Sequence, residues 1–281
     1  MAFCCRVKGL LMACVLEIGS GVLPLLYLAL LIDYGATFFL RTRTHTRSPW
    51  LLAVIVVHAA LLALRAVQVG HPPVSATPEI LSLLALATAA VYAWVEFVHR
   101  DRRTGVFVLL LAFLFQYTSS ILLAGHVAAA TEAAAPAAWS RLHVLPALVA
   151  YTALAFAGIY GILYLLAQRS LRLHRFGVFF DRLPPLDLLG PMTWHALLTG
   201  FVFMTIAIIS APLMMHGGSE AGGITAKVAS KIITGSAAWL VYATAVLGRW
   251  LGKWPASRVA AIAVVGFVVV MVLLAASGLL S

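Results

Sequence analysis

RLHVLPALVAYTALAFAGIYGILYLLAQR, residues 141–169, decides the fold class of this chain. Its apolar run continues almost without a break until Gln168 and Arg169 close it. A helix needs about 20 consecutive apolar residues to cross the hydrocarbon core of a bilayer, and it satisfies its own backbone hydrogen bonds there. The stretch therefore predicts a membrane-spanning helix, with His143 at its entrance and Tyr151 further inside.

Comparable apolar stretches recur along the whole chain. Of its 281 residues, 63% are hydrophobic and 10% are charged, which is too apolar for a soluble globular protein. The short alternating strands of a membrane β-barrel are absent from the sequence pattern. We therefore predict an all-α, polytopic integral membrane helical bundle in a single membrane domain, residues 1–281. The spans, about eight in number, are expected near residues 20–40, 51–68, 78–97, 105–124, 143–167, 193–214, 231–249 and 258–279.

The net charge of +10 is unevenly distributed along the chain. Basic residues gather in alternate connections between the expected spans, which follows the positive-inside rule. We therefore expect a multi-pass protein of the cell inner (cytoplasmic) membrane, with both termini on the outer, periplasmic side. The excess of basic over acidic residues indicates membrane topology and attraction to anionic lipids, not a nucleic-acid partner. The basic residues of the connections assigned inside include Arg41, Arg43, Arg47, Arg100, Arg102, Arg103, Arg169, Arg172, Arg175, Arg182, Arg249, Lys253 and Arg258.

The longest inner connection contains residues 171–183, where arginines alternate with leucine, valine and phenylalanine. This pattern predicts a short amphipathic helix that lies in the membrane interface, before Pro184 and Pro185 end it.

The three cysteines, Cys4, Cys5 and Cys14, lie before or at the start of the first span. They form no CxxC, no CxxCH and no set with metal-binding spacing. The sequence leaves open whether any of them is acylated.

Three ionisable residues fall inside expected spans, where such groups are costly and often functional. Pairing with an inner arginine would explain Asp33. Arg65 lies near the outer end of its span and is expected to extend its side chain to the interface. His58 lies mid-span, where a neutral, hydrogen-bonded core role and a ligand role both remain open.

The nine histidines separate by their expected place in the membrane. His143 and His216 would lie at the same depth, at the outer ends of two neighbouring spans. Two neutral imidazoles on opposite sides of a porphyrin make a bis-histidine haem site, whereas zinc needs more protein ligands than are spaced here. The alternative is that both histidines cap their helices at the interface. His71 is the alternative to His216 as the second ligand. His195 lies at the inner start of its span.

Several segments from about residue 70 onward resemble the cytochrome c assembly family of the CcsA and HemX type. GHPPVSATPEILSLLALATAAVYAW resembles a family stretch that begins G-H-F-P, and HVLPALVAYTALAFAGIYGILYLL resembles its H-x(7)-Y-A helix. LPPLDLL and AAWLVYATAVLGRW resemble two further segments, and a Gly-Phe pair follows. The matching positions are Gly70, His71, Pro73, Ser75, Glu79, His143, Tyr151, Trp239, Tyr242, Gly266 and Phe267. The resemblance implies that His143 is an external haem ligand.

The chain departs from the full haem ligases of this type in two places. Its last outer loop reads HGGSEAGGITAKVAS where those ligases carry a Trp-rich segment, and it ends in ASGLLS where they carry a second external histidine. It is closer to the short HemX-like and YpjD-like members. Those keep histidines near His195, and the YpjD-like members also near His58 and His216.

Two functional interpretations follow. The first is a non-catalytic, haem-handling membrane protein of cytochrome c biogenesis or of the assembly of a haem-containing membrane complex. The second is a structural subunit or assembly factor of a larger, respiratory-type membrane complex that has lost cofactor binding. Neither is an enzyme, because the Trp-rich platform is missing. For the first, the cofactor is b-type haem, and the partners are haem, other membrane subunits or cytochrome assembly components, and anionic lipids. Its cofactor-binding residues are His143, His216, His71, Tyr151, His58 and His195, with His143 and His216 on the iron.

Overall fold

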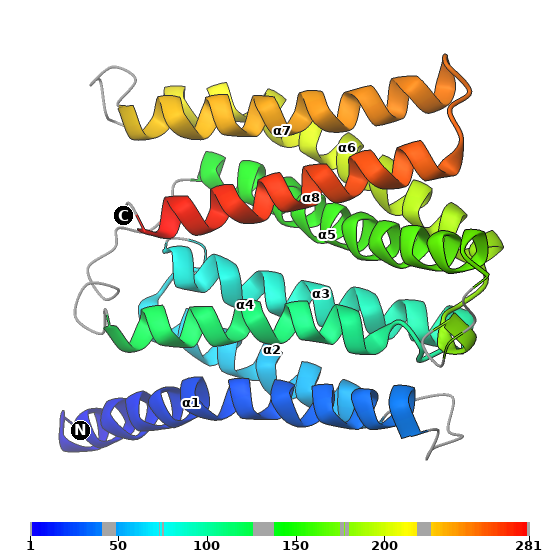
Figure 1. The fold of residues 1–281 in the computed structure, drawn as a ribbon. Helices are drawn as coiled ribbons and strands as arrows, with labels where there is room; N and C mark the ends of the chain where they lie inside the picture. The colour runs from blue at the N-terminus through cyan, green and yellow to red at the C-terminus, as the bar shows by residue number, and fades with distance from the viewer. Residues whose placement is uncertain are drawn as a thin grey trace. The chain divides into compact units, whose positions relative to one another are not determined.

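The computed structural model is all-helical over the part of the chain that it describes. It describes residues 2–40, 49–72, 74, 76–125, 138–174, 177, 180–217 and 226–279, and the side chains of fewer. Eight α-helices and one short 3-10 helix lie in these ranges, with no strand (Figure 1). They are α1 (Ala2–Leu40), α2 (Pro49–Val69), α3 (Thr77–His99), α4 (Gly105–Gly125), α5 (Ala138–Arg172), η1 (Phe180–Arg182), α6 (Leu186–Gly217), α7 (Ala226–Trp250) and α8 (Ala256–Leu279).

Seven of these helices are long and apolar enough to cross a membrane, counted over their described residues. The eighth, α8, has an apolar described segment, Ala256–Val272, that is shorter than the others. The prediction of a polytopic helical bundle is therefore confirmed, with an eighth helix where the eighth span was expected. The chain is a multi-pass membrane protein.

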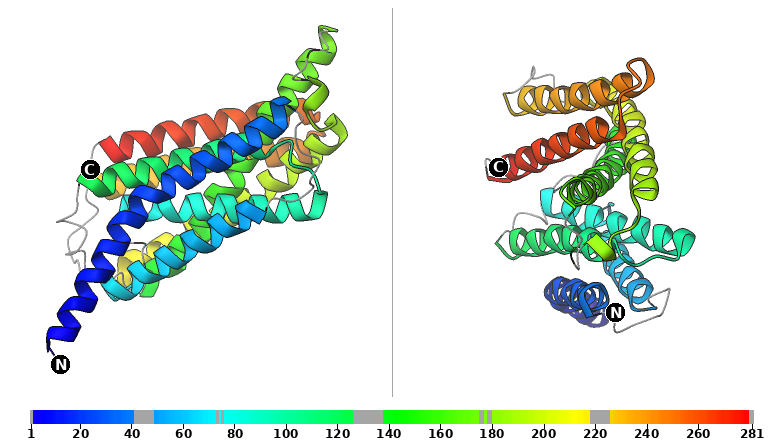
Figure 2. Two further views of the ribbon diagram at one scale, coloured as in Figure 1. Left: turned by 90° about the horizontal axis from the view of Figure 1, so that it is seen from below. Right: turned by 45° about the vertical axis from the view of Figure 1, so that its right-hand side comes forward.

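The helices group into two compact units, residues 1–136 and residues 137–281, here called unit 1 and unit 2. Unit 1 contains α1 to α4, and unit 2 contains α5 to α8. Figure 2 shows both groups from two further directions. The prediction of one continuous membrane domain stays a prediction, and each unit is described by itself below.

In unit 1, α4 packs against α3 and α1, and α2 contacts α1 and α3. Tyrosines fill much of the space between these helices, and Tyr27, Tyr34 and Tyr92 are fully buried. The Tyr34 and Tyr92 rings meet edge to face with centroids 5.8 Å apart. Both press on Gly105 at the start of α4, where a Cβ atom would lie 2.3 Å from the Tyr34 ring. Only a glycine at position 105 therefore lets α4 pack this closely against Tyr34 and Tyr92.

In unit 2, α5 is the central helix and packs against α6 and α8. Small residues let these helices come close. A Cβ atom on Gly158 would lie 2.4 Å from the Phe267 ring, and one on Gly200 would lie 2.6 Å from Leu154. Gly266 of α8 is equally close to Tyr242 of α7, at 2.6 Å. The Gly-Phe pair seen in the sequence therefore makes two of the tightest contacts of this unit.

The segment 171–183 is not the single amphipathic helix that the sequence predicts. The helix α5 continues through Arg172, a turn follows, and the three-residue helix η1 precedes Pro184 and Pro185. Residues 175, 176, 178 and 179 lie outside the described residues. Continuation of α5 is favoured because helical hydrogen bonding does not stop where the apolar run stops. The position of this segment relative to the membrane stays a prediction.

Candidate functional site

The imidazole of His143 is fixed to the neighbouring helix α6. Its Nδ1 lies 2.8 Å from the carbonyl oxygen of Ala207. A carbonyl oxygen accepts only, so the proton of this bond is on Nδ1 of His143. The Ser210 hydroxyl donates to the same Ala207 carbonyl oxygen at 2.9 Å. It lies 3.4 Å from Nδ1 of His143, so the shorter contact of that nitrogen is the one to Ala207. In the neutral ring, Nε2 is then the nitrogen with a free lone pair.

This arrangement suits a metal ligand. Histidines that bind metals commonly donate their other ring N–H to a backbone carbonyl, which fixes the tautomer and the orientation of the ring. The His143 side chain is partly exposed, so it is accessible. The residues present therefore fit axial ligation of a haem iron by Nε2 of His143.

Along α6, His216 lies six residues beyond Ser210, which corresponds to about 9 Å of helix. The expectation that His216 shares the membrane depth of His143 stays a prediction. The His216 side chain lies outside the described residues. Its role as second ligand stays a prediction.

His58 has the opposite ring state and is held in the core of unit 1. The Tyr27 hydroxyl lies 2.9 Å from Nδ1, and the Ser82 hydroxyl lies 2.9 Å from Nε2. Ser82 gives its proton to Gln116 Oε1, so Nε2 of His58 must donate to Ser82. Tyr27 then donates to Nδ1. Both nitrogens are engaged and the side chain is fully buried. Of the two roles left open by sequence, this geometry favours the hydrogen-bonded core histidine.

No described contact joins the remaining predicted site residues to His143. His71 belongs to unit 1, is buried, and its Nδ1 lies 3.0 Å from the Pro72 carbonyl. Its role as second haem ligand in place of His216 stays a prediction. His195 is exposed on α6 and lies 12 residues before Ala207, about 18 Å along the helix. Tyr151 packs against the core of unit 2 that includes Tyr242. Within the described residues, no three His, Cys, Asp or Glu side chains gather as a metal-binding group.

An ion-pair cluster explains Asp33, as pairing with an inner arginine predicted. Arg102 donates to Asp33 at 3.0 Å, lies 3.9 Å from Glu96, and places its guanidinium 4.2 Å from the centre of the Tyr34 ring. Tyr34 in turn donates to Glu96. Burial alone would lower the pKa of Arg102, but Tyr34, Asp33 and Glu96 outweigh it and raise that pKa. The cluster ties α1, α3 and the start of α4 together.

Arg65 has a partner that the sequence did not indicate. Its Nε lies 3.2 Å from Glu79 Oε1, and 18% of its side chain is exposed. Glu79 lies 14 residues away, in the first turn of α3, and is buried, with 3% of its side chain exposed. The extension of Arg65 to the membrane interface stays a prediction.

Two contacts in unit 2 were not anticipated from the sequence. The first is that of His143 with the Ala207 carbonyl, since a backbone acceptor has no sequence signature. The second involves Trp239, whose indole N–H donates to Thr205 at 2.8 Å and whose ring stacks on Phe201 with centroids 5.5 Å apart. The Trp-x-x-Tyr segment pointed to this tryptophan without indicating its partner.

Residues 74–281 match the family model described as cytochrome C assembly protein. The match covers more than half of the chain. The chain belongs to the cytochrome c assembly protein family. No curated protein and no solved structure matches it. The matched region of this cytochrome c assembly protein contains His143, Ala207 and the whole of unit 2. It also contains α3 and α4, whereas His58 and His71 precede it.

The motifs of this cytochrome c assembly protein that resemble the family now have structural roles. Tyr242 and Gly266 touch each other across α7 and α8, and Phe267 packs on Gly158 of α5. Glu79 accepts from the Ala76 backbone N–H at 3.3 Å as well as from Arg65, so it fixes the start of α3. These residues build the two units, whereas His143 and His71 are motif residues whose Nδ1 atoms contact backbone carbonyls.

Proposed function

We propose that this cytochrome c assembly protein handles haem, with His143 as an axial ligand. The observation that carries the proposal is the hydrogen bond from Nδ1 of His143 to the Ala207 carbonyl, at 2.8 Å. That bond leaves Nε2 unprotonated and fixes the ring plane against α6. Family membership supports the same conclusion, because assembly of a cytochrome c requires haem to be delivered.

The residues around His143 have separate tasks in this proposal. When bound, haem would supply an iron that takes nitrogen ligands. The Ala207 carbonyl holds the imidazole in one tautomer, and Ser210 shares that carbonyl from the same helix. Apolar residues of α5 and α6 would shield a bound porphyrin from water. His216 is proposed as the second ligand, with His71 as its substitute, and the haem is of the b type.

We further propose that the protein is not itself an enzyme and lies in the cell inner membrane with both termini outside. The alternation of basic connections supports this orientation. In it, His143 lies near the outer face, where haem would pass to other membrane subunits or cytochrome assembly components. Anionic lipids would contact the basic inner connections.

A second candidate is a structural subunit or assembly factor of a larger membrane complex without cofactor. The same hydrogen bond favours it in one respect, since an imidazole that donates to Ala207 also fastens α5 to α6. In that case His143 is a structural residue, and its Nε2 faces lipid headgroups or a partner.

The visible spectrum of the purified protein distinguishes these candidates. With haem supplied, the wild type is expected to show a Soret band. His143→Ala should abolish that band or convert it to a five-coordinate spectrum, while gel filtration remains unchanged. His99→Ala is the matched control, because His99 is exposed at the end of α3 and is not a predicted ligand. A Soret band that is unaltered in His143→Ala would contradict the ligand role, and a wild type that never takes up haem would favour the structural candidate.

A further inference from the structure

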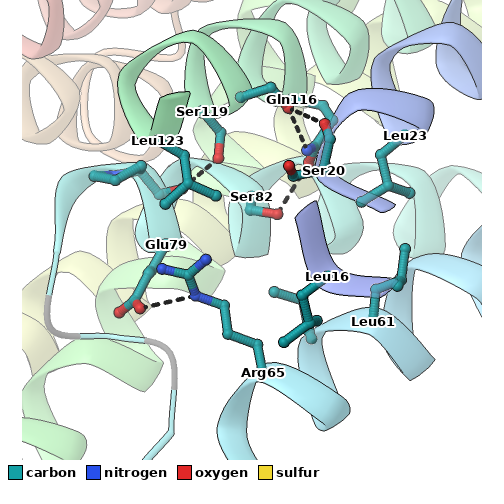
Figure 3. A pocket seen from close by; sticks show the side chains of 13 residues that line it. Leu16, Ser20, Leu23, Leu61, Arg65, Glu79, Ser82, Gln116, Ser119 and Leu123 are labelled. Atoms are coloured by element: carbon teal, nitrogen blue, oxygen red, sulfur yellow. Dashed lines mark hydrogen bonds and ion pairs between the residues drawn. The ribbon is translucent and has the colours of Figure 1, made fainter. Parts of the chain in front are cut away.

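A small cavity, lined by both polar and apolar side chains, lies between the four helices of unit 1. Its volume is about 50 Å³, and every helix of the unit contributes to its wall. Figure 3 shows Arg65 and Glu79 on one side and the hydroxyls of Ser82 and Ser119 turned inward. The lining side chains are polar Ser20, Arg65, Glu79, Ser82, Gln116, Ser119 and Ser120, with Leu16, Leu23, Leu61, Leu62, Pro78 and Leu123 between them.

A directed chain of hydrogen bonds leads from the wall of this cavity to the centre of unit 1. Tyr27 donates to His58 and His58 donates to Ser82, each at 2.9 Å. Ser82 donates to Gln116 at 2.9 Å, Gln116 to Ser120 at 3.2 Å, and Ser120 to the Ser20 carbonyl at 2.8 Å.

The orientation of the Gln116 amide in this chain is fixed by its neighbours. Ser120 spends its one proton on the Ser20 carbonyl, so it must accept from the amide NH₂. The amide oxygen therefore faces Ser82. If the Gln116 amide were reversed, its oxygen would face Ser120, whose only proton is already donated to the Ser20 carbonyl. All five bonds thus point the same way, and they assign the proton of His58 to Nε2.

The size of the cavity and the polar groups on its wall suit water. A water molecule needs at least about 10–15 Å³ of such volume and two to four polar partners, so the cavity has room for up to about three. Seven lining side chains carry polar groups and six are apolar, so water would bind along the polar part of the wall. Ser119 donates to the Pro78 carbonyl at 2.6 Å, which leaves its oxygen as an acceptor. Arg65 uses Nε for Glu79 and has four further N–H donors on its terminal nitrogens.

The cavity lies where α2 ends and α3 begins. Arg65 is four residues from the end of α2 at Val69, and Pro78 and Glu79 are in the first turn of α3. Ser82 both lines the cavity and accepts from His58. One hydroxyl group therefore separates the cavity from the buried imidazole.

We propose that this cavity is a water-filled inlet, entered from the membrane face that carries the α2–α3 connection, through which water reaches the His58 chain. The ligand is water itself, and small aqueous cations can follow the same route. Neither His143 nor His71 lines the inlet, so the proposal does not rest on haem binding.

Thiol reactivity toward silver ions tests the inlet. Cys4, Cys5 and Cys14 are first replaced by serine, and Ser119→Cys is then compared with Ile121→Cys on the same helix. Ser119 is buried at the cavity, whereas the Ile121 side chain does not line the cavity and is 53% exposed. Silver is added to sealed vesicles on one side, and the remaining thiols are counted with a maleimide after denaturation.

The expected result is that Ser119→Cys loses its thiol at least tenfold faster than Ile121→Cys, and only from the α2–α3 side. Equal rates, or a slower rate at Ser119→Cys, would overturn the proposal. If gel filtration shows that Ser119→Cys does not fold, the wild type labelled with ¹⁵N-histidine is measured instead in bilayers. The His58 ring, assigned by its loss in His58→Phe, should receive magnetisation from water within milliseconds. A His58 signal that receives none would equally refute the inlet.

Discussion

His58 and His143 carry their ring protons on opposite nitrogens. His58 donates from Nε2 to Ser82 at 2.9 Å, whereas His143 donates from Nδ1 to the Ala207 carbonyl at 2.8 Å. An imidazole binds a metal through the nitrogen that has no proton. In His58 that nitrogen accepts from Tyr27, while in His143 it is Nε2, on the side away from the carbonyl. The tautomer therefore distinguishes a core histidine from a candidate ligand.

Replacing His58 is expected to reduce stability without affecting haem. His58→Ala removes the acceptor of the buried Tyr27 hydroxyl and leaves a cavity, so the free energy of unfolding should fall by about 2–4 kcal/mol. Denaturation in SDS measures this loss. In a double-mutant cycle, His58→Ala should cost less once Tyr27→Phe has removed the hydroxyl. A Soret band that disappears in the folded His58→Ala protein would contradict the core role.

Adjacent arginines should differ sharply in their contribution to stability. Arg102→Leu leaves two carboxylates, Asp33 and Glu96, without their cation, and a broken buried pair typically costs about 3–5 kcal/mol. Arg103→Leu is the matched control, because its side chain is 51% exposed and pairs with Asp101 at the surface. Such pairs contribute about 0–1 kcal/mol. Equal losses in the two variants would show that the Arg102 cluster does not stabilise unit 1.

A methyl group at Gly266 should disturb the contact between α7 and α8. Its Cβ atom would lie 2.6 Å from the Tyr242 ring, and overpacking of this kind costs about 1–3 kcal/mol. Gly235→Ala on α7 has no atom within 4 Å of the added Cβ and should change stability little. Thermal denaturation in detergent compares the two. The Tyr242→Ala background should relieve the effect of Gly266→Ala, and a persistent loss there would assign it to another cause.

The orientation of the chain is open to a direct test. Reporter fusions after Arg103 and after Ser219 should signal from opposite sides of the membrane, with Arg103 inside, because basic residues gather in alternate connections. Alkaline phosphatase and a fluorescent protein, active on opposite sides, provide the two signals. Matching signals would reject the topology and the placement of His143 near the outer face.

Helix positions followed from the sequence where the apolar run is uninterrupted, and not where Asp, Gly or Pro interrupts it. The expected span 105–124 corresponds to α4, Gly105–Gly125, and 78–97 to α3, Thr77–His99. By contrast, α6 begins at Leu186, seven residues before its expected start. Hydropathy reports the contact with lipid, whereas a helix ends where its backbone hydrogen bonds end.

The partners of the polar residues were less predictable than the residues themselves. Asp33, His58 and Arg65 were noticed because ionisable groups are rare inside spans. Their partners lie on other helices, as Tyr27 lies 31 residues from His58. A single sequence records no such pairing. The acceptor of His143 is a backbone carbonyl, which every residue has, so side-chain identity carries no information about it.

The hydrogen-bonded chain in unit 1 starts on α1 at Tyr27, passes through α2, α3 and α4, and returns to α1 at Ser20. This closed path has a consequence for synthesis of the protein. Until α4 enters the bilayer, Ser82 has no Gln116 to accept its proton, and the chain is open in the middle of the membrane. Polar groups without partners are costly there. A nascent chain that stops after α3 is therefore expected to remain associated with the insertion machinery or to be degraded, and synthesis of α4 is the step that commits the first four helices to the lipid.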